Sequence, residues 1–187
     1  MVESKEKQRL ARLAAEIRRE LKDIAKVKKE ALSALEVFQK KQPKLLEVRG
    51  TAGILHDFYN GIENVFGRIS DELDGGIPAG ENWHRVLLSN MAMQVSDIRP
   101  QVITQDTEQM LDEFLRFRHL CRHGYGHQLE WERIRELLEK VEVAYSSLEN
   151  NPIFRRRGAP RCMGDSFEND LTAFMSFLET LAQSLKS

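Results

Sequence analysis

The sequence has few of the features that mark secreted, membrane-spanning or disulfide-stabilised proteins. Only two cysteines occur in 187 residues, Cys121 and Cys162, and no signal-peptide pattern opens the chain. We therefore expect a cytoplasmic protein without disulfides. No apolar run approaches the ~20 residues that a membrane-spanning helix needs, so we expect no membrane association. The net charge of −1 gives no general attraction to nucleic acid, and any RNA binding must come from a local basic patch.

Proline and glycine are also scarce, and their scarcity favours helices. The five prolines and eleven glycines lie mainly between segments in which apolar residues recur every three or four positions. With abundant Leu, Glu, Lys, Arg and Ala, this pattern predicts an all-α fold and one domain over residues 1–187. Residues 149–164 are expected to form an exposed, arginine-rich loop. We expect helices over residues 3–41, 45–73, 83–93, 106–124, 128–147 and 166–185.

Local signals place the ends of these helices. Pro43 disfavours helix in the residue before it, and Asp74-Gly-Gly76 is a stop because glycine accepts the left-handed conformation. Thr104 or Asp106 is expected to cap the fourth helix. Lys28 interrupts the narrow apolar stripe of the long first helix, whose flanks are heavily charged. This stripe also fits a plain helical scaffold that assembles through its first helix.

One ten-residue stretch, RFRHLCRHGY at residues 116–125, concentrates groups that can bind a phosphate and move a proton. Five of its ten residues are Arg or His: Arg116, Arg118, His119, Arg122 and His123. On a straight helix Arg118 and His123 would point in directions that differ by roughly 140°. Either the helix ends or bends near Gly124, or the same residues of a second copy complete the site.

Arg118 and His123 are the smallest set that could cleave RNA without a metal. Such cleavage needs a base for the 2′-hydroxyl proton and an acid for the leaving 5′-oxygen, and His suits both tasks because its pKa lies near neutrality. A guanidinium can hold the charge on the phosphate with two hydrogen bonds. The same residues also fit a simple basic helix end, in which Tyr125 is a half-buried packing residue.

A zinc site is an alternative for this stretch. His119, His123 and His127 follow one another at a spacing of four, and Cys121 is nearby. However, His127 comes after Gly124 and therefore is not expected on the helix, and no carboxylate motif of the metalloprotease kind occurs. We therefore expect no metal and no cofactor.

Other polar groups have both a structural and a functional interpretation. Arg155, Arg156 and Arg157 form either a solvated loop or an RNA contact. Trp83-His84 is interpreted as a packing anchor. A polar stripe on the second helix is interpreted as a helix–helix hydrogen-bond network, or as part of the site: His56, Tyr59, Asn60 and Glu63.

At Arg118-x4-His123-x-Tyr125 the sequence resembles the HEPN superfamily, in particular its HepT-like toxin branch. The superfamily signature is an Arg, four to six intervening residues and then a His, and HepT-like proteins have a Tyr two positions after the His. The resemblance covers roughly residues 10–148 and the last helix. Flanking segments are similar too: Leu55–Glu63, Leu73–Gly76, Asn82–Arg85, Phe114–His119 and Trp131–Arg133.

The resemblance implies a HEPN-like up-and-down helical bundle with a long N-terminal helix. It also implies a homodimer in which both protomers line one cleft. The implied activity is that of a metal-independent endoribonuclease toxin, with Arg118 and His123 catalytic and RNA, tRNA being one candidate, as the substrate. The antitoxin would be a minimal, MntA-like nucleotidyltransferase that transfers AMP to Tyr125, where the added charge and bulk would obstruct RNA. Supporting roles would fall to Arg116, His119 and Arg122.

The sequence departs from the family pattern at two places. His119 stands where many relatives have Asn, and residues 149–164 resemble an insertion. The first departure keeps a second class of function open, in which the chain is a non-catalytic helical partner or regulatory subunit of a minimal nucleotidyltransferase.

Overall fold

The computed structural model describes residues 2–123, 129–146 and 167–184 and confirms the predicted all-α class. Within these ranges the chain forms helices and no strand. The predicted helices agree with them to within a few residues; Leu129 and Glu130, predicted helical, lie before the start of α5. The loop expected at 149–164 falls outside the described residues. The helices are α1 (Val2–Gln39), α2 (Leu45–Leu73), α3 (Trp83–Met91), α4 (Gln105–His123), α5 (Trp131–Ser146) and α6 (Phe167–Ser184).

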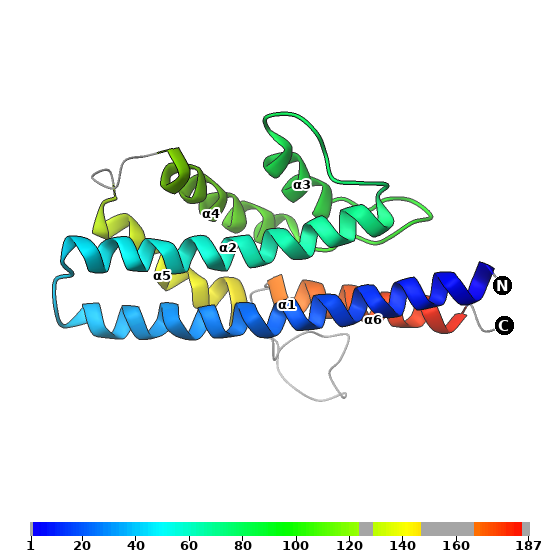
Figure 1. Cartoon of the computed structure of the whole chain (residues 1–187), viewed down its shortest axis with the longest axis horizontal. Coiled ribbons are helices and arrows are strands. Elements are labelled where there is room, and N and C mark those ends of the chain that lie inside the picture. The colour runs from blue at the N-terminus through cyan, green and yellow to red at the C-terminus, as the bar shows by residue number, and fades with distance from the viewer. Residues whose placement is uncertain (1, 124–128, 147–166, 185–187) are drawn as a thin grey trace.

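Helices α1 and α2 form a long antiparallel hairpin that runs the length of the molecule (Figure 1). The break predicted at Pro43 is confirmed, since it falls in the turn between the two helices. Glu47 secures the start of α2: its carboxylate accepts a hydrogen bond from the backbone N–H of Lys44 (2.7 Å) and one from the ammonium of Lys41 (2.6 Å). A carboxylate here satisfies an N–H group that has no partner within the helix.

The remaining helices pack around this hairpin. Helix α1 contacts α5 and α6, whereas α2 contacts α3, α4 and α5. Lys28, which interrupts the apolar stripe of α1, pairs with Glu142 on α5 (3.1 Å), and its ammonium lies 4.5 Å from the ring centroid of Tyr145. The ion pair and the aromatic ring together accommodate the charge. The interruption in the stripe therefore marks the contact between α1 and α5.

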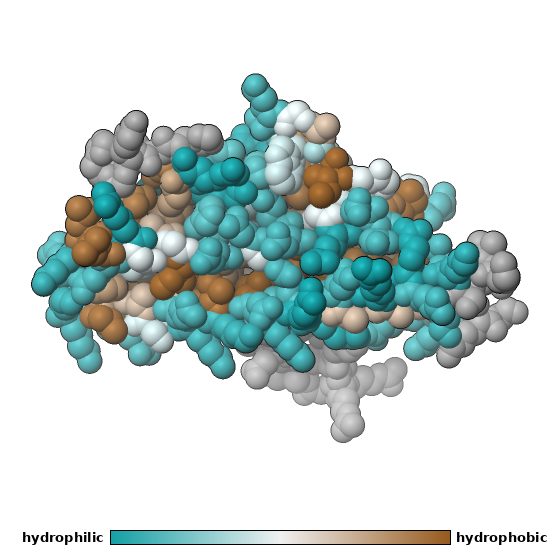
Figure 2. Space-filling view, in the orientation of Figure 1, coloured by the Kyte–Doolittle hydropathy of each residue, from teal (hydrophilic) through white to brown (hydrophobic). Residues whose placement is uncertain are grey.

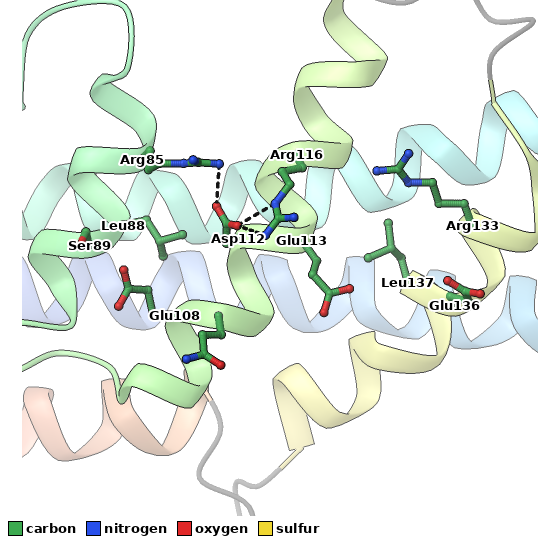
Figure 3. A pocket seen from close by; sticks show the side chains of 11 residues that line it. Arg85, Leu88, Ser89, Glu108, Asp112, Glu113, Arg116, Arg133, Glu136 and Leu137 are labelled. Carbon is green, nitrogen blue, oxygen red and sulfur yellow. Dashed lines mark hydrogen bonds and ion pairs between the residues drawn. The ribbon is translucent and has the colours of Figure 1, made fainter.

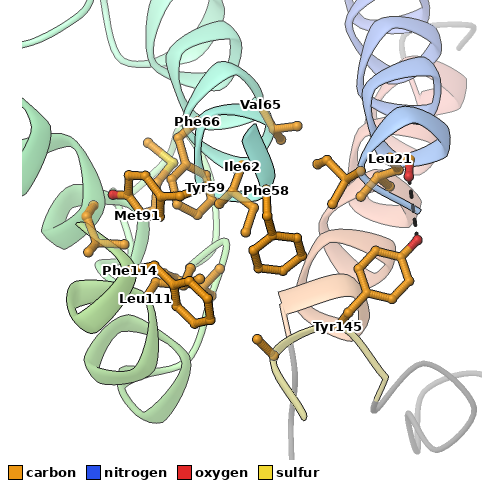
Figure 4. Close-up of a cluster of buried hydrophobic side chains, with 14 of the residues drawn as sticks. Leu21, Phe58, Tyr59, Ile62, Val65, Phe66, Met91, Leu111, Phe114 and Tyr145 are labelled. Atoms are coloured by element: carbon orange, nitrogen blue, oxygen red, sulfur yellow. Dashed lines mark hydrogen bonds between the residues drawn. The ribbon is translucent and has the colours of Figure 1, made fainter. Parts of the chain in front are cut away.

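The hydrophobic core is centred on the broad apolar face of α2, as its periodicity predicts (Figure 4). Phe58 packs against Phe114 of α4 with ring centroids 5.4 Å apart. On the side of α1, the Tyr145 hydroxyl donates to the backbone carbonyl of Leu21 at 3.5 Å. Burial of side chains of this size stabilises the fold by about 1.5–3 kcal/mol each. Helix α2 contributes five of the largest fully buried side chains among the described residues: Leu55, Phe58, Tyr59, Ile62 and Phe66.

The stop predicted at the end of α2 is confirmed. Gly75 and Gly76 have φ angles of 84° and 132°, and the backbone N–H of Gly76 donates to the carbonyl of Ser70 at 3.1 Å. Arg99 fixes the segment after α3 to this helix end. Its Nε and Nη2 donate to the two carboxylate oxygens of Asp74, both at 2.7 Å, and its side chain is fully buried.

Helix α4 is capped by Thr104, one of the two residues predicted to do so. The backbone N–H of Thr107 donates to Oγ1 of Thr104 at 3.2 Å. From this cap α4 runs antiparallel to α2 and ends above the first half of α2 (Figure 1). The cap and the direction of α4 together decide which residues of α2 lie beside the motif stretch.

The visible surface in Figure 2 is mainly hydrophilic, with a few exposed apolar side chains. Val37, Leu45 and Leu46 lie next to the hairpin turn in the sequence and are between 55% and 78% exposed. Among the described helices, none combines the length and the apolar character needed to cross a bilayer.

Candidate functional site

Arg118, the arginine of the motif, points into the protein. It is 7% exposed. Its Nε donates to Oδ1 of Asn60 (2.8 Å), its Nη2 pairs with Oε2 of Glu63 (3.1 Å), and its Nη1 lies 3.2 Å from Nε2 of His84. Each nitrogen of the guanidinium therefore contacts a different side chain, two from α2 and one from α3. We call Asn60, Glu63, His84 and Arg118 the Arg118 network.

The Arg118 network fixes the tautomer of His84. An arginine nitrogen can only donate, so Nε2 of His84 accepts from Arg118. The proton of the ring then resides on Nδ1, which donates to Oε1 of Glu63 at 2.6 Å. Burial of the ring lowers the pKa of His84 below its ordinary value, although the Glu63 carboxylate acts in the opposite direction. His84 is therefore neutral at pH 7, and Glu63 is the counter-charge of Arg118.

This arrangement holds the guanidinium in one position. The side chain of Glu63 is 10% exposed and that of Arg118 is 8% exposed, so the two charges are almost completely removed from water. Charges in that situation persist only when they are paired and hydrogen-bonded. The contacts with Asn60 and His84 complete the pairing. Among the described residues these three contacts engage three of the five N–H groups of the guanidinium, which leaves two for another acceptor.

The polar stripe predicted on α2 takes part through two of its four residues. Asn60 and Glu63 lie three residues apart and face α4. Tyr59 instead packs in the hydrophobic core, where burial raises the pKa of its hydroxyl. His56 has a buried Nδ1 with no hydrogen-bond partner in the described part of the chain. Burial lowers the pKa of His56, and the positive charge of Arg118 lowers it further.

His84 has a larger role than the sequence indicated. The packing role predicted for Trp83-His84 is confirmed: Trp83 packs against the hydrophobic core, His84 is buried, and their ring centroids lie 3.6 Å apart. The same ring also connects Glu63 with Arg118, which sequence reasoning missed. His84 precedes Arg118 by 34 residues and lies on another helix. The signal that could have found it is the pairing of a histidine with a bulky aromatic residue at a helix start, where burial of the imidazole demands polar partners.

The other described side chains of the motif stretch lie at the surface. Arg116 is exposed, and its Nε donates to Asp112 one turn earlier at 2.7 Å. Arg122 is exposed as well. His119 is exposed, and its ring lies edge-on to that of His84 with centroids 5.7 Å apart. The structure therefore brings His119 close to the Arg118 network, whereas Arg116 belongs to a different surface.

Helix α4 is continuous from Gln105 to His123. Arg118 and His123 thus lie on one unbroken helix, and helical geometry separates their directions by roughly 140°. An end of the helix after His123 does not change this relation. The side chain of His123 falls outside the described part of the structure, as do Tyr125, His127 and the residues expected to contact RNA, Arg155, Arg156 and Arg157.

The described residues include no group of three or more His, Cys, Asp or Glu side chains that could hold a metal ion. Cys121, considered above as a zinc ligand, is half-buried, and burial raises the pKa of its thiol.

A family model described as "HepT-like protein" matches residues 50–154, more than half of the chain. The chain belongs to the HepT-like family. No curated protein and no solved structure matches it. The HepT-like match is narrower than the resemblance described above: it covers most of α2 and all of α3, α4 and α5, but neither α1 nor α6. It includes every member of the Arg118 network together with His123 and Tyr125.

Proposed function

We propose that this HepT-like protein is a metal-independent endoribonuclease, the toxin of a toxin–antitoxin module. The observation that carries the proposal is the fixed position of Arg118, whose three guanidinium nitrogens contact Asn60, Glu63 and His84. A charged donor held in place before substrate binds stabilises developing charge without a reorganisation cost. Family membership supports the proposal, because the matched region contains the whole Arg118-x4-His123-x-Tyr125 motif.

In the proposed reaction His residues move the protons and Arg118 stabilises the phosphate. A base takes the proton of the 2′-hydroxyl, the 2′-oxygen attacks phosphorus, and the bond to the 5′-oxygen breaks as an acid protonates that oxygen. His123 is the last residue of α4, where the helix dipole favours its protonated form. Arg118 acts through its remaining N–H groups and through space, since Coulomb interactions are stronger in a site shielded from water.

We propose that the active form is a homodimer. The divergent directions of Arg118 and His123 on one straight helix favour a site to which two protomers contribute. A two-fold axis near the end of α4 would supply one His123 as the base and the other as the acid. Each chain is taken as one helical domain, and His119, Arg122 and Arg116 are assigned supporting contacts with the substrate. Arg155, Arg156 and Arg157 are proposed RNA contacts.

Neutralisation is proposed to proceed through Tyr125. Transfer of AMP from ATP to its hydroxyl by a nucleotidyltransferase antitoxin would release pyrophosphate and add a negative charge two residues from His123. That charge would repel an RNA phosphate. The intact mass of the protein produced with and without the transferase tests this step: an increase of ~329 Da, the mass that AMP adds, mapped to Tyr125, is the expected result. An unchanged mass would contradict it.

The cleavage test compares the wild-type protein with His123→Ala. Both are expressed in a host without an antitoxin and then purified identically and incubated with RNA in a buffer containing EDTA. The proposal expects growth arrest and RNA cleavage by the wild-type protein and loss of both in the variant. Equal cleavage by the two proteins would point to a contaminating nuclease or to another catalytic residue, and absence of cleavage by both would remove the nuclease proposal.

One observation favours a second candidate, a non-catalytic partner of a nucleotidyltransferase. Arg118 is almost completely buried and paired with Glu63, as a structural arginine would be. Under this alternative the purified dimer binds the transferase and leaves RNA intact. Cleavage in EDTA that is lost in His123→Ala would eliminate it.

A further inference from the structure

A pocket of about 790 Å³ opens between α3, α4 and α5, on the face of α4 away from the Arg118 network (Figure 3). It is lined by eleven residues, and its charges are divided between two sides. In Figure 3 the arginines Arg85, Arg116 and Arg133 lie along one side, and the carboxylates of Glu108, Glu113 and Glu136 lie along the other. None of these residues belongs to the proposed reaction centre, apart from a supporting role for Arg116.

The basic side has an excess of positive charge. Asp112 pairs with two of the arginines: its Oδ2 accepts from Nε of Arg116 at 2.7 Å, and its Oδ1 lies 3.2 Å from Nη2 of Arg85. Arg133 has no ion pair within the described residues and is exposed. One carboxylate, Asp112, therefore pairs with two of the three guanidiniums on this side. Over the whole lining four carboxylates stand against three guanidiniums, so the positive excess is confined to this side. Such a surplus attracts an anion, and a shared carboxylate holds two of the guanidiniums in place for it.

The rest of the pocket suits the uncharged part of a nucleotide. Leu88 and Leu137 contribute to its lining but are only 1% and 4% exposed, so the open groups across from the arginines are polar. Glu113 is engaged by Lys140 of α5. Glu108 and Glu136 have no such partner within the described residues, and free carboxylates accept hydrogen bonds from the amino groups of bases.

We propose that this pocket binds a single-stranded segment of the RNA substrate, with phosphates on the arginine side and the edge of a base toward the carboxylates of Glu108 and Glu136. Single-stranded RNA has this division into a charged backbone and a flat face with hydrogen-bond donors at its edge. An acidic peptide would meet carboxylates across the pocket, and a basic peptide would meet the arginines. This inference rests on the proposed function, because it assigns part of the path of the RNA to the cleavage centre.

The position of the pocket on α4 supports that path. Arg116 precedes His123 by seven residues on the same straight helix, a distance of about 10 Å along the axis. Glu108 lies two turns further away, so the basic side is nearer to the motif end of the helix. RNA bound at the arginines would thus continue toward His123.

The test measures binding of a fluorescein-labelled, unstructured single-stranded RNA by anisotropy, in EDTA and over a range of salt concentrations. The proteins carry His123→Ala so that the probe stays intact, and they contain in addition Arg133→Gln, Arg85→Gln or both. Loss of one phosphate contact lowers the slope of log K against log salt by about 0.7 and affinity at 0.1 M salt about fivefold. The double variant should therefore bind about 25-fold more weakly.

Arg135→Gln is the matched control. Arg135 is an exposed arginine on the same helix as Arg133, but it does not line the pocket, and its pair with Glu139 at 3.8 Å is also exposed. The control should bind within about twofold of the parent. Equal losses in Arg135→Gln and Arg133→Gln, unchanged binding in the double variant, or absence of RNA binding by the parent would each overturn the inference.

Failure of this inference can be told apart from failure of the proposed function. Suppose that the wild-type protein cleaves RNA in EDTA, and that the Arg85→Gln/Arg133→Gln double variant binds and cleaves RNA equally well. The nuclease proposal then stands, and the pocket assignment is wrong. If RNA binding depends on the arginines but no preparation cleaves, the pocket assignment stands and the nuclease proposal is wrong. Loss of transferase binding with unchanged RNA binding would make the pocket a protein interface instead.

Discussion

Replacement of Glu63 by alanine is the sharpest test of the Arg118 network. The Glu63 carboxylate has two partners, Arg118 at 3.1 Å and Nδ1 of His84 at 2.6 Å. Glu63→Ala removes the counter-charge and leaves Arg118 with two neutral contacts, to Asn60 and His84. The donor on Nδ1 of His84 loses its acceptor at the same time.

The magnitude follows from burial. Removal of one partner from a buried ion pair destabilises a protein by about 3–5 kcal/mol, because the other charge remains buried without compensation. The Arg118 side chain is 8% exposed, so water can replace little of the lost interaction. We expect the free energy of unfolding to fall by about 3 kcal/mol, near the lower end of that range because Asn60 and His84 stay in contact. For a domain whose total stability is about 5–15 kcal/mol, this is a large fraction.

Urea denaturation followed by far-ultraviolet circular dichroism measures this loss as a lower midpoint at unchanged m-value. Glu139→Ala is the control: Glu139 also pairs with an arginine, Arg135, but both side chains are more than half exposed and 3.8 Å apart. Exposed pairs of this kind contribute about 0.3–0.5 kcal/mol. The two variants delete the same side chain, so the difference between them reports burial.

A double variant separates electrostatics from packing. When Glu63→Leu is combined with Arg118→Met, both charges are gone, and replacement of a buried ion pair by apolar residues is often neutral or stabilising. We expect the double variant to recover most of the stability that Glu63→Ala loses. A loss below about 1 kcal/mol in Glu63→Ala, or an equal loss in Glu139→Ala, would refute the claim that Arg118 depends on a buried counter-charge.

Three further outcomes are expected from the same unfolding assay. The pKa of His84 is lowered in the folded state, so the unfolded chain binds more protons below about pH 6.5, and the free energy of unfolding should fall as pH drops through that value. His84→Gln should reduce the slope of this free energy against pH by up to about 1.4 kcal/mol per pH unit. An unchanged slope in the variant contradicts this. Asp74→Ala should cost about 3–5 kcal/mol by leaving the fully buried charge of Arg99 without its carboxylate, and a loss under about 1 kcal/mol would count against it. Gly61→Ala should destabilise by about 1–3 kcal/mol, since its Cβ would lie 2.6 Å from a side-chain carbon of α1. Gly53→Ala meets no atom within 4 Å and should stabilise by up to about 1 kcal/mol; effects of the same sign at both glycines would be contrary to expectation.

The family match and the structure bear on different parts of the motif. The match places Arg118, His123 and Tyr125 within one HepT-like region. The structure adds that Arg118 is inward-facing and paired, whereas Arg122 at the next turn is exposed. The motif stretch therefore combines a structurally fixed charge, Arg118, with the exposed side chains of His119 and Arg122 on one helix.

The local patterns of the sequence determined the helices and their ends. Apolar spacing of three and four residues is a property of each segment alone, so it predicted α1 to α6 nearly to their bounds. Thr104 and the glycines after Leu73 act on backbone groups within a few residues, and their capping roles were predictable for that reason. Membership of the HepT-like family is also visible in the sequence, because the motif is a short spacing along the chain.

Only the tertiary structure decided what each polar side chain contacts. Asn60 and Arg118 are 58 residues apart, and Lys28 and Glu142 are 114 apart, so no pattern within a segment relates them. Their contacts depend on how α2 and α3 are placed against α4, and α1 against α5, and core packing sets these placements. The same packing places His84, which was predicted only as a packing residue, between Glu63 and Arg118. It also brings Arg85, Arg116 and Arg133, from three different helices, to one pocket. The amino-acid sequence determines the chemistry of each residue, but the burial of apolar neighbours determines which polar residues come into contact.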